Sequence, residues 1–239
     1  MKDNITKIAI KKEIVFPFAK NIWVFTEKGA REIKKIEDSL TNMLEKYGFK
    51  RWITPILIPT SLFQNHGPTD IKPYETNKDM LLDPLALGIY HYLSCQKENK
   101  FPFYIYENRT VFRQEKQSQA FCTSDEFRRI DAFFFDSRDR INTIYKILLD
   151  NIVMFLDKKQ LRVKVKTHKS NKYQKHSEII IITSDKRELE VVNLAVVNNL
   201  NLKKYEIPVP DRIPVHSGYC SIGINRLFYC LLDKKFSKD

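Results

Sequence analysis

The most regular hydrophobic pattern in the chain lies in residues 27–47, "EKGAREIKKIEDSLTNMLEKY". Apolar side chains recur there at intervals of three and four residues, at Ile33, Ile36, Leu40 and Leu44. This spacing places them on one face of an α-helix, with charged residues on the other. The pattern predicts an amphipathic helix that ends before Gly48, since glycine is favoured just after a helix.

Shorter segments rich in β-branched and aromatic residues are typical of strands. They are residues 51–59, 104–112, 127–135, 161–166, 178–183 and 189–197. Further helices are expected at 86–96, at 139–156 and around Arg226. Pro55 predicts that the first strand lies at an edge or interface, because proline cannot donate to a central ladder. Runs of strands with helices beside them predict an α+β fold, an antiparallel sheet flanked by helices.

Residues 112–135, "FRQEKQSQAFCTSDEFRRIDAFFF", join two of these strands and carry an unusual mixture of side chains. The segments 104–112 and 127–135 are expected to form an antiparallel hairpin. Side chains alternate along strands, so Arg113 and Glu115 point one way together, as do Phe127 and Arg129. One face of the hairpin would thus present two cations, a carboxylate and a ring. By itself such a face could simply be solvated.

A second polar patch precedes the last predicted helix, in "HSGYCSIGINRLFYCLL" at residues 216–232. Gly223 would allow a backbone to pass close to a ligand. Arg226 lies at the junction of strand and helix, where backbone N–H groups are unpaired and suit an anion. A glycine turn with an arginine is common, but two arginine-bearing elements together indicate an anionic ligand.

Length and composition set limits on the protein class. The 239 residues are 43% hydrophobic, enough for one large domain, and we expect a single domain over 1–239. The sequence contains no apolar stretch long enough for a membrane helix, and its N-terminal residues do not resemble a signal peptide. We therefore expect a cytoplasmic protein without a membrane partner. Four scattered cysteines do not suggest a disulfide framework. The net charge of +12 favours an acidic partner, such as a nucleic acid, a nucleotide or an acidic protein, although lysine-rich composition alone could produce it.

Taken in order, these motifs resemble the catalytic domain of class II aminoacyl-tRNA synthetases. The helix followed by Gly48, Phe49 and Pro55 is similar to motif 1, which builds a dimer interface in that family. "FRQE…DEFRRIDAFFF" resembles motif 2, and "SIGINRLFYCLL" resembles motif 3. Within the class, the chain is most similar to archaeal, zinc-dependent seryl enzymes. Their truncated relatives, the amino acid:carrier-protein ligases, are also similar.

This resemblance implies an ATP site. Arg113 would contact the α-phosphate and Arg226 the β- and γ-phosphates, because a guanidinium pairs two oxygens at once. Phe127 would stack on adenine, while the segment "ELEVVN" would supply groups for Mg²⁺ and nucleotide, with the carboxylate of Glu190 as the magnesium ligand. The full ATP-binding set implied by the resemblance is Arg113, Glu115, Phe127, Glu190, Asn193, Gly223 and Arg226, with the two arginines as catalytic residues.

The reaction that the resemblance implies joins a carboxylic acid, expected to be an amino acid, to ATP and gives an acyl-adenylate. The acyl group would then pass to a carrier protein or a small acceptor. A tRNA acceptor is less favoured, because the motifs occupy residues 20–235 and leave no segment for a tRNA-binding domain. Two alternatives stay open. One is a free-standing aminoacyl-tRNA synthetase or another tRNA-acting relative, and the other is a non-catalytic paralogue. The resemblance further implies a homodimer.

Two departures from the family pattern bear on the substrate. Zinc-dependent relatives hold their metal with three residues; Glu115 and Cys220 match two of these positions, but the third falls at Leu87, which cannot ligate zinc. We therefore expect no zinc, with Cys220 a small buried hydrophobe. Thr123 also stands where relatives often carry an arginine. Either the substrate is not held by its α-amino group in the usual way, or the protein is a degenerate copy.

Overall fold

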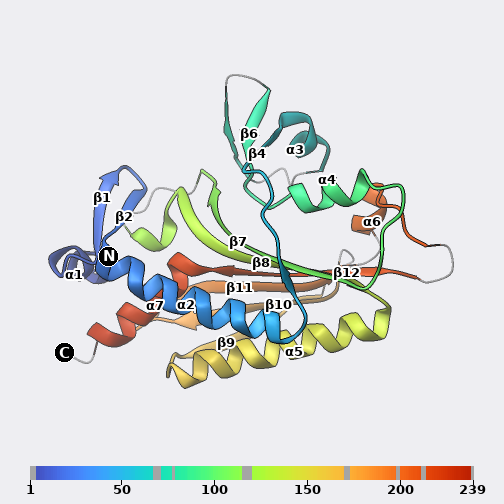
Figure 1. Cartoon of the computed structure of the whole chain (residues 1–239). Coiled ribbons are helices and arrows are strands. Elements are labelled where there is room, and N and C mark those ends of the chain that lie inside the picture. The colour runs from blue at the N-terminus through green and yellow to red at the C-terminus, as the bar shows by residue number, and fades with distance from the viewer. Residues whose placement is uncertain are drawn as a thin grey trace.

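A large antiparallel sheet forms the centre of the protein (Figure 1). The computed structural model describes residues 4–66, 71–76, 79–114, 120–169, 173–197, 200–210 and 214–237. The sheet has seven strands in the order β3 (Lys50–Arg51), β7 (Phe103–Phe112), β8 (Glu126–Asp136), β12 (His216–Gly223), β11 (Glu188–Val197), β10 (Tyr173–Ile182) and β9 (Val163–Thr167). Neighbouring strands are antiparallel except β3 and β7, which are parallel. The predicted α+β class is confirmed.

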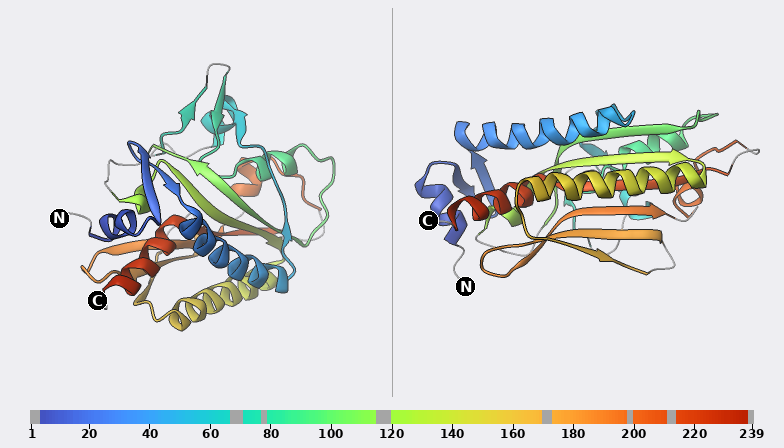
Figure 2. Two further views of the ribbon diagram at one scale, coloured as in Figure 1. Left: turned by 60° about the vertical axis from the view of Figure 1, so that its left-hand side comes forward. Right: turned by 90° about the horizontal axis from the view of Figure 1, so that it is seen from below.

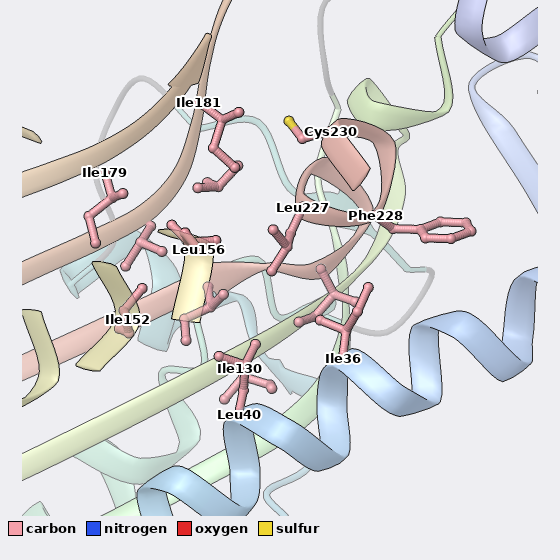
Figure 3. Close-up of a cluster of buried hydrophobic side chains, with 14 of the residues drawn as sticks. Ile36, Leu40, Ile130, Ile152, Leu156, Ile179, Ile181, Leu227, Phe228 and Cys230 are labelled. Atoms are coloured by element: carbon pink, nitrogen blue, oxygen red, sulfur yellow. The ribbon is translucent and has the colours of Figure 1, made fainter. Parts of the chain in front are cut away.

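Three helices cover one face of this sheet: α2 (Glu27–Lys46), α5 (Arg138–Lys158) and α7 (Ile224–Phe236). In the view from below in Figure 2 these helices run roughly along the strands, over the near face of the sheet. Their apolar stripes meet the sheet in the main core, where α2 contributes Ile36 and Leu40 and β8 contributes Ile130 (Figure 3). Helix α1 (Asn4–Lys11) and the hairpin of β1 (Val15–Ala19) and β2 (Ile22–Phe25) extend this layer beside α7.

The other face of the sheet carries a smaller and separate layer (Figure 1). It comprises the three-stranded sheet of β4 (Leu57–Pro59), β6 (Met80–Leu82) and β5 (Tyr74–Glu75) with α3 (Thr60–His66), α4 (Gly88–Ser94) and α6 (Leu200–Lys204). Its apolar residues form a second core with Phe133 and Phe135, whereas the side chain between them, Phe134, belongs to the main core. This alternation is the ordinary pleat of a strand buried on both faces.

Several sequence predictions are confirmed. Helix α2 buries the predicted stripe, and Gly48 follows it with a φ of +84°, a left-handed conformation that favours glycine. The hairpin of β7 and β8 has the expected antiparallel pairing. The helices expected at 86–96 and 139–156 are α4 and α5, with shifted ends. The strand expected at 178–183 starts earlier, at Tyr173. Within the described part of the chain, no helix combines the length and apolarity needed to cross a membrane.

The predicted strand at residues 51–59 is wrong. Strand β3 ends at Arg51, and β4 begins at Leu57 in a different sheet. Between them the backbone N–H of Thr54 donates to the side-chain oxygen Glu107 Oε1 at 2.7 Å and not to the backbone of a neighbouring strand. Pro55 has no N–H to donate. The segment therefore crosses from one sheet to the other. The edge or interface position was expected for a strand that carries Pro55, but Pro55 lies between two strands; β3, which ends before it, is the terminal strand of the large sheet.

Candidate functional site

A cavity of about 520 Å³ lies on the face of the large sheet that carries the smaller layer. Its volume falls in the range of about 300–1,000 Å³ that is usual for small-molecule sites. Of the seven residues in the predicted ATP-binding set, six line it: Arg113, Phe127, Glu190, Asn193, Gly223 and Arg226. The seventh, Glu115, lies outside the described residues. The fold thus brings together side chains from three separate regions of the sequence.

Arg113 and Phe127 form the contribution of the β7–β8 hairpin. Arg113 directly follows β7, and its backbone N–H donates to the Asp125 carbonyl at 2.9 Å. Its guanidinium carbon lies 5.3 Å from the centre of the Phe127 ring, a cation–π distance. Phe127 and Arg129 both line the cavity, as the alternation of side chains along a strand predicts. The hairpin face therefore presents a ring and two cations.

Gly223 and Arg226 form the contribution of the β12–α7 junction. Gly223 ends β12, and Arg226 is in the first turn of α7, where its Nη1 donates to the Glu190 carbonyl at 3.1 Å. The φ of Gly223 is −79°, and a Cβ built there would lie 3.8 Å from its nearest neighbour, the carbonyl oxygen of Val191. Packing within the described protein does not itself require glycine here. Its expected role, close approach of the backbone to a ligand, stays a prediction.

Glu190 and Asn193 extend the site along β11. Asn193 Nδ2 lies 3.3 Å from Glu190 Oε1, and Asn193 Oδ1 accepts the hydroxyl of Tyr219 at 3.0 Å. His176 Nε2 also lies 3.1 Å from the same Oδ1. These contacts hold the amide, and the Glu190 carboxylate belongs to the wall of the cavity that Arg113 and Arg226 also line. The arrangement fits Mg²⁺, which is usually held by one or two carboxylates together with substrate phosphates.

The register of β7, β8 and β12 arranges the floor beneath the cavity in rows that sequence reasoning missed, and five members of these rows line the cavity itself. The first row is Arg109, Arg129 and Gly223; the second is Glu107, Asp131 and Ser221; the third is Ile105, Phe133 and Tyr219. Along the strands, the floor therefore changes from cationic to acidic to aromatic. A sequence signal did exist, because charged residues at every second position interrupt otherwise apolar strands, and such residues are buried only when they are paired.

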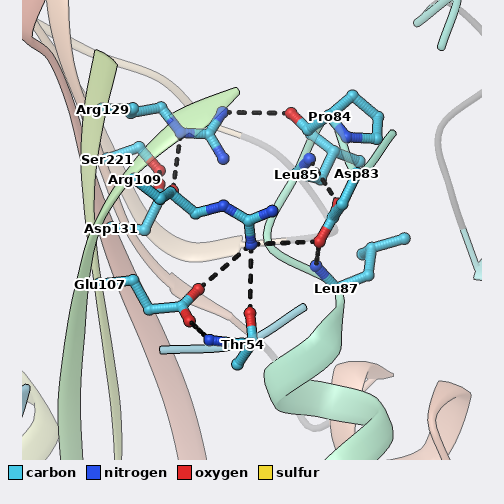
Figure 4. A network of polar contacts seen from close by, with 10 residues as sticks. All are labelled: Thr54, Asp83, Pro84, Leu85, Leu87, Glu107, Arg109, Arg129, Asp131 and Ser221. Atoms are coloured by element: carbon cyan, nitrogen blue, oxygen red, sulfur yellow. Dashed lines mark hydrogen bonds and ion pairs between the residues drawn. The ribbon is translucent and has the colours of Figure 1, made fainter. Parts of the chain in front are cut away.

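The charged rows are held by a buried network (Figure 4). Arg109 Nη1 donates to Thr54 Oγ1 at 3.2 Å and to the carboxylates of Asp83 and Glu107, each at 3.3 Å. Asp83 accepts the backbone N–H groups of Leu85 and Leu87, both at 2.8 Å. Burial raises the pKa of Asp83 and of Glu107 above their usual ranges, although Arg109 acts in the opposite direction on both. The network ties the segment before α4 to the floor of the cavity.

A second set of contacts fixes the other arginine of the floor. Arg129 Nε donates to Asp131 Oδ2 at 2.7 Å, and its Nη1 lies 3.4 Å from the carbonyl of Pro84. Ser221 donates its hydroxyl to the other Asp131 oxygen at 2.6 Å. Asp131 is 1% exposed, so its carboxylate is both buried and neutralised by Arg129. Arg129 itself remains in the cavity wall with a fixed orientation.

Aromatic side chains close the other end of the cavity. Tyr90 of α4 stacks on Tyr205, with ring centres 4.4 Å apart and planes at 13°, and meets the Phe133 ring edge to face at 5.5 Å. Burial raises the pKa of Tyr205 and of Tyr219, so both are neutral phenols at physiological pH. Leu87, which stands where zinc-dependent relatives carry their third metal ligand, also lines this cavity.

Cys220 lies away from the cavity. It is fully buried in the main core, on the face of β12 opposite to Tyr219 and Ser221. Burial raises the pKa of its thiol, which disfavours the thiolate form that binds metals. Among the described residues, which exclude Glu115, no three His, Cys, Asp or Glu side chains form a group able to hold a metal ion. The expectation of no zinc stays a prediction.

The fold and the motifs agree with a comparison against known families. The model of the tRNA synthetases class II core domain (F) matches residues 76–233. This span covers more than half of the chain and includes the β7–β8 hairpin, β11, β12 and most of α7. The chain belongs to the class II aminoacyl-tRNA synthetase core-domain family.

Known relatives and solved structures lie in the same class. A proline–tRNA ligase of Blochmanniella floridana is 24% identical over 162 residues, which are 62% of this chain and 28% of that protein. Giardia lamblia prolyl-tRNA synthetase, solved with prolyl-adenylate, aligns with a TM-score of 0.84 at 15% identity over 96% of this chain and 52% of its own. M. kandleri seryl-tRNA synthetase, solved with A. aeolicus tRNASec, aligns with a TM-score of 0.81 at 16% identity. The alignment covers 98% of this chain and 57% of that one. The match thus spans 28% of the length of this curated relative, and the chain covers about half of the two solved structures.

Proposed function

We propose that the protein activates a carboxylic acid with ATP to form an acyl-adenylate. The observation that carries this proposal is the convergence of Arg113, Phe127 and Arg226 on one cavity. Two guanidinium groups suit a polyphosphate, since each can pair two oxygens and stays charged at any physiological pH. The ring of Phe127 offers a surface on which a base can stack. The solved prolyl-tRNA synthetase of Giardia, which shares the fold, contains an adenylate.

In this mechanism the acid binds as its carboxylate, and one carboxylate oxygen attacks the α-phosphorus of ATP. The bond from the α-phosphorus to the bridging oxygen breaks, and pyrophosphate leaves with that electron pair. Arg113 stabilises the charge that develops on the α-phosphate, and Arg226 holds the β- and γ-phosphates. When bound at Glu190, Mg²⁺ would neutralise phosphate charge. Catalysis rests on positioning and electrostatics, so no protein nucleophile is required.

The acceptor in this proposal is a carrier-protein thiol or a small molecule. A second candidate is tRNA, which is favoured by the relationship to a proline–tRNA ligase and by the net charge of +12. Incubation with total tRNA separates the two proposals. Acylation of tRNA in a filter assay would support the second candidate, whereas exchange activity without tRNA acylation would favour the first.

ATP–pyrophosphate exchange with a panel of carboxylic acids tests the activation step. Arg113→Ala and Arg226→Ala should each remove about 2–4 kcal/mol of transition-state stabilisation, as loss of other preorganised donors does. This corresponds to a decrease of roughly 30- to 1,000-fold in kcat/KM. Arg140→Ala, on the exposed side of α5, is the matched control and should retain activity. Normal exchange in both cavity variants, or no exchange with any acid, would contradict the proposal.

A further inference from the structure

The aromatic end of the cavity bears on which acid the protein activates. Its walls include Leu85, Leu87, Tyr90, Phe133 and Tyr205, which come from α4, the segment before it, β8 and the segment after α6. The register places this end two rows away from the arginines, on the same floor. A molecule with its carboxylate near Arg113 and Arg129 would therefore extend its body among apolar and aromatic side chains.

In the part of the chain that the structure describes, the three buried acidic side chains beside this path are not available to a ligand cation. Asp83, Glu107 and Asp131 are at most 1% exposed, and none of the three lines the cavity. Asp83 and Glu107 are paired with Arg109, and Asp131 is paired with Arg129. An additional cation near them would meet guanidinium groups as well as carboxylates. The middle row of the floor thus offers no open carboxylate for an ammonium group.

Glu190 is the one carboxylate among the described residues that lines the cavity. It lies at the cationic end, where its backbone carbonyl accepts from Arg226, and its side chain lies 3.3 Å from the amide of Asn193. In the proposed function its charge faces Mg²⁺ and the phosphates. Asn193 Oδ1, which could also accept from a cation, already receives the hydroxyl of Tyr219.

The segment that ends at α4 turns apolar side chains toward the cavity. Both Leu85 and Leu87 donate their backbone N–H groups to the buried carboxylate of Asp83 and line the cavity with their side chains (Figure 4). The backbone is thus fixed by a charge-assisted pair of hydrogen bonds. Leucine at both positions provides neither donor nor acceptor where a polar substrate group would need one.

We infer that the substrate is a carboxylic acid with an apolar or aromatic body and no α-ammonium group. This inference rests on the proposed function, because it assigns the substrate class of the same site. Among the described residues the aromatic end of the cavity has no carboxylate in its wall, and burial of an ammonium group against leucine side chains and tyrosine rings without such a partner is strongly unfavourable. Burial of an alkyl or aryl chain in the same place is favourable, and the stacked pair of Tyr90 and Tyr205 suits a planar ring.

Calorimetry on the intact chain tests the inference in the presence of the unreactive analogue α,β-methylene-ATP and magnesium. The probes are matched pairs that differ by the amino group: 3-phenylpropanoate with L-phenylalanine, and 4-methylpentanoate with L-leucine. We expect one or both acids without the amino group to bind about 100-fold more tightly than their partners, since an apolar pocket rejects even an added hydroxyl by about that factor. Equal or tighter binding of the amino acids would overturn the inference, and so would failure of all four to bind.

A substitution provides a second measurement. Leu87→Glu should gain affinity for L-phenylalanine and lose affinity for 3-phenylpropanoate, whereas Leu87→Gln, with the same shape and no charge, should not gain the amino acid. The same result with both variants would oppose the inference. If Leu87→Glu does not fold, the test is the ratio of the dissociation constants of each amino acid and its partner without the amino group, measured in the unchanged protein. Exchange is measured in parallel, so that a binding preference without pyrophosphate exchange refutes the activation step and leaves the pocket assignment intact.

Discussion

Replacement of Arg109 by methionine tests whether the buried network holds the floor of the cavity. The Arg109 side chain is 7% exposed, and it lies between Asp83 at 0% and Glu107 at 2%. Methionine preserves much of the volume but removes the charge, and it leaves two buried carboxyl groups without the guanidinium that bridges them. Breaking a buried ion pair in this way costs about 3–5 kcal/mol. We expect the free energy of unfolding to fall by that amount near neutral pH.

The destabilisation caused by Arg109→Met is expected to depend on pH. Burial raises the pKa of Asp83 and Glu107 in the folded state. A carboxyl group with a raised pKa contributes stability below its unfolded pKa and loses that contribution as the pH rises through its folded pKa. Without Arg109, which lowers both pKa values, they rise further. The destabilisation caused by Arg109→Met should therefore be larger at about pH 7.5 than at about pH 5, where more of the carboxyl groups are protonated.

Urea denaturation followed by circular dichroism at the two pH values measures both effects. Glu107→Gln is the matched control. It keeps an acceptor for the Thr54 N–H and leaves Asp83 as the partner of Arg109, so its cost should be about 1 kcal/mol. A loss below about 1 kcal/mol for Arg109→Met, or a loss that is the same at both pH values, would refute the view that this guanidinium compensates buried carboxylates.

Three further predictions concern the ligand, the assembly and the metal. Gly223→Ala should change the free energy of unfolding by at most about 0.5 kcal/mol, because its Cβ has room within the protein, yet raise the KM for ATP in exchange assays; an unchanged KM would remove Gly223 from the site. Ile53 is 85% exposed within the segment 27–59 through which we propose a homodimer. Ile53→Asp should shift the sedimenting species from dimer to monomer, and a monomeric unsubstituted protein at micromolar concentration would exclude the dimer. Metal analysis after dialysis should find essentially no zinc, and one zinc per chain that is lost in Cys220→Ser would contradict this.

Local pattern accounts for much of the fold and part of the site. The repeat of apolar residues in α2 and the position of Gly48 depend only on neighbours within a few turns of chain, and both were predicted. The hairpin followed from strand propensity and alternation. The resemblance in motif order led to Arg113 and Arg226 as members of one site, and the structure places both in the wall of one cavity.

Only the tertiary structure decided what surrounds those arginines. Tyr90 and Tyr205 stack although 115 positions separate them, and Thr54 reaches Glu107 across the break that replaced a predicted strand. Such contacts depend on the register of distant strands and on how the second layer packs over the sheet, which no local periodicity encodes. A leucine at position 87 is apolar in any fold. It bears on the substrate only because the chain folds to place it in the wall of the cavity.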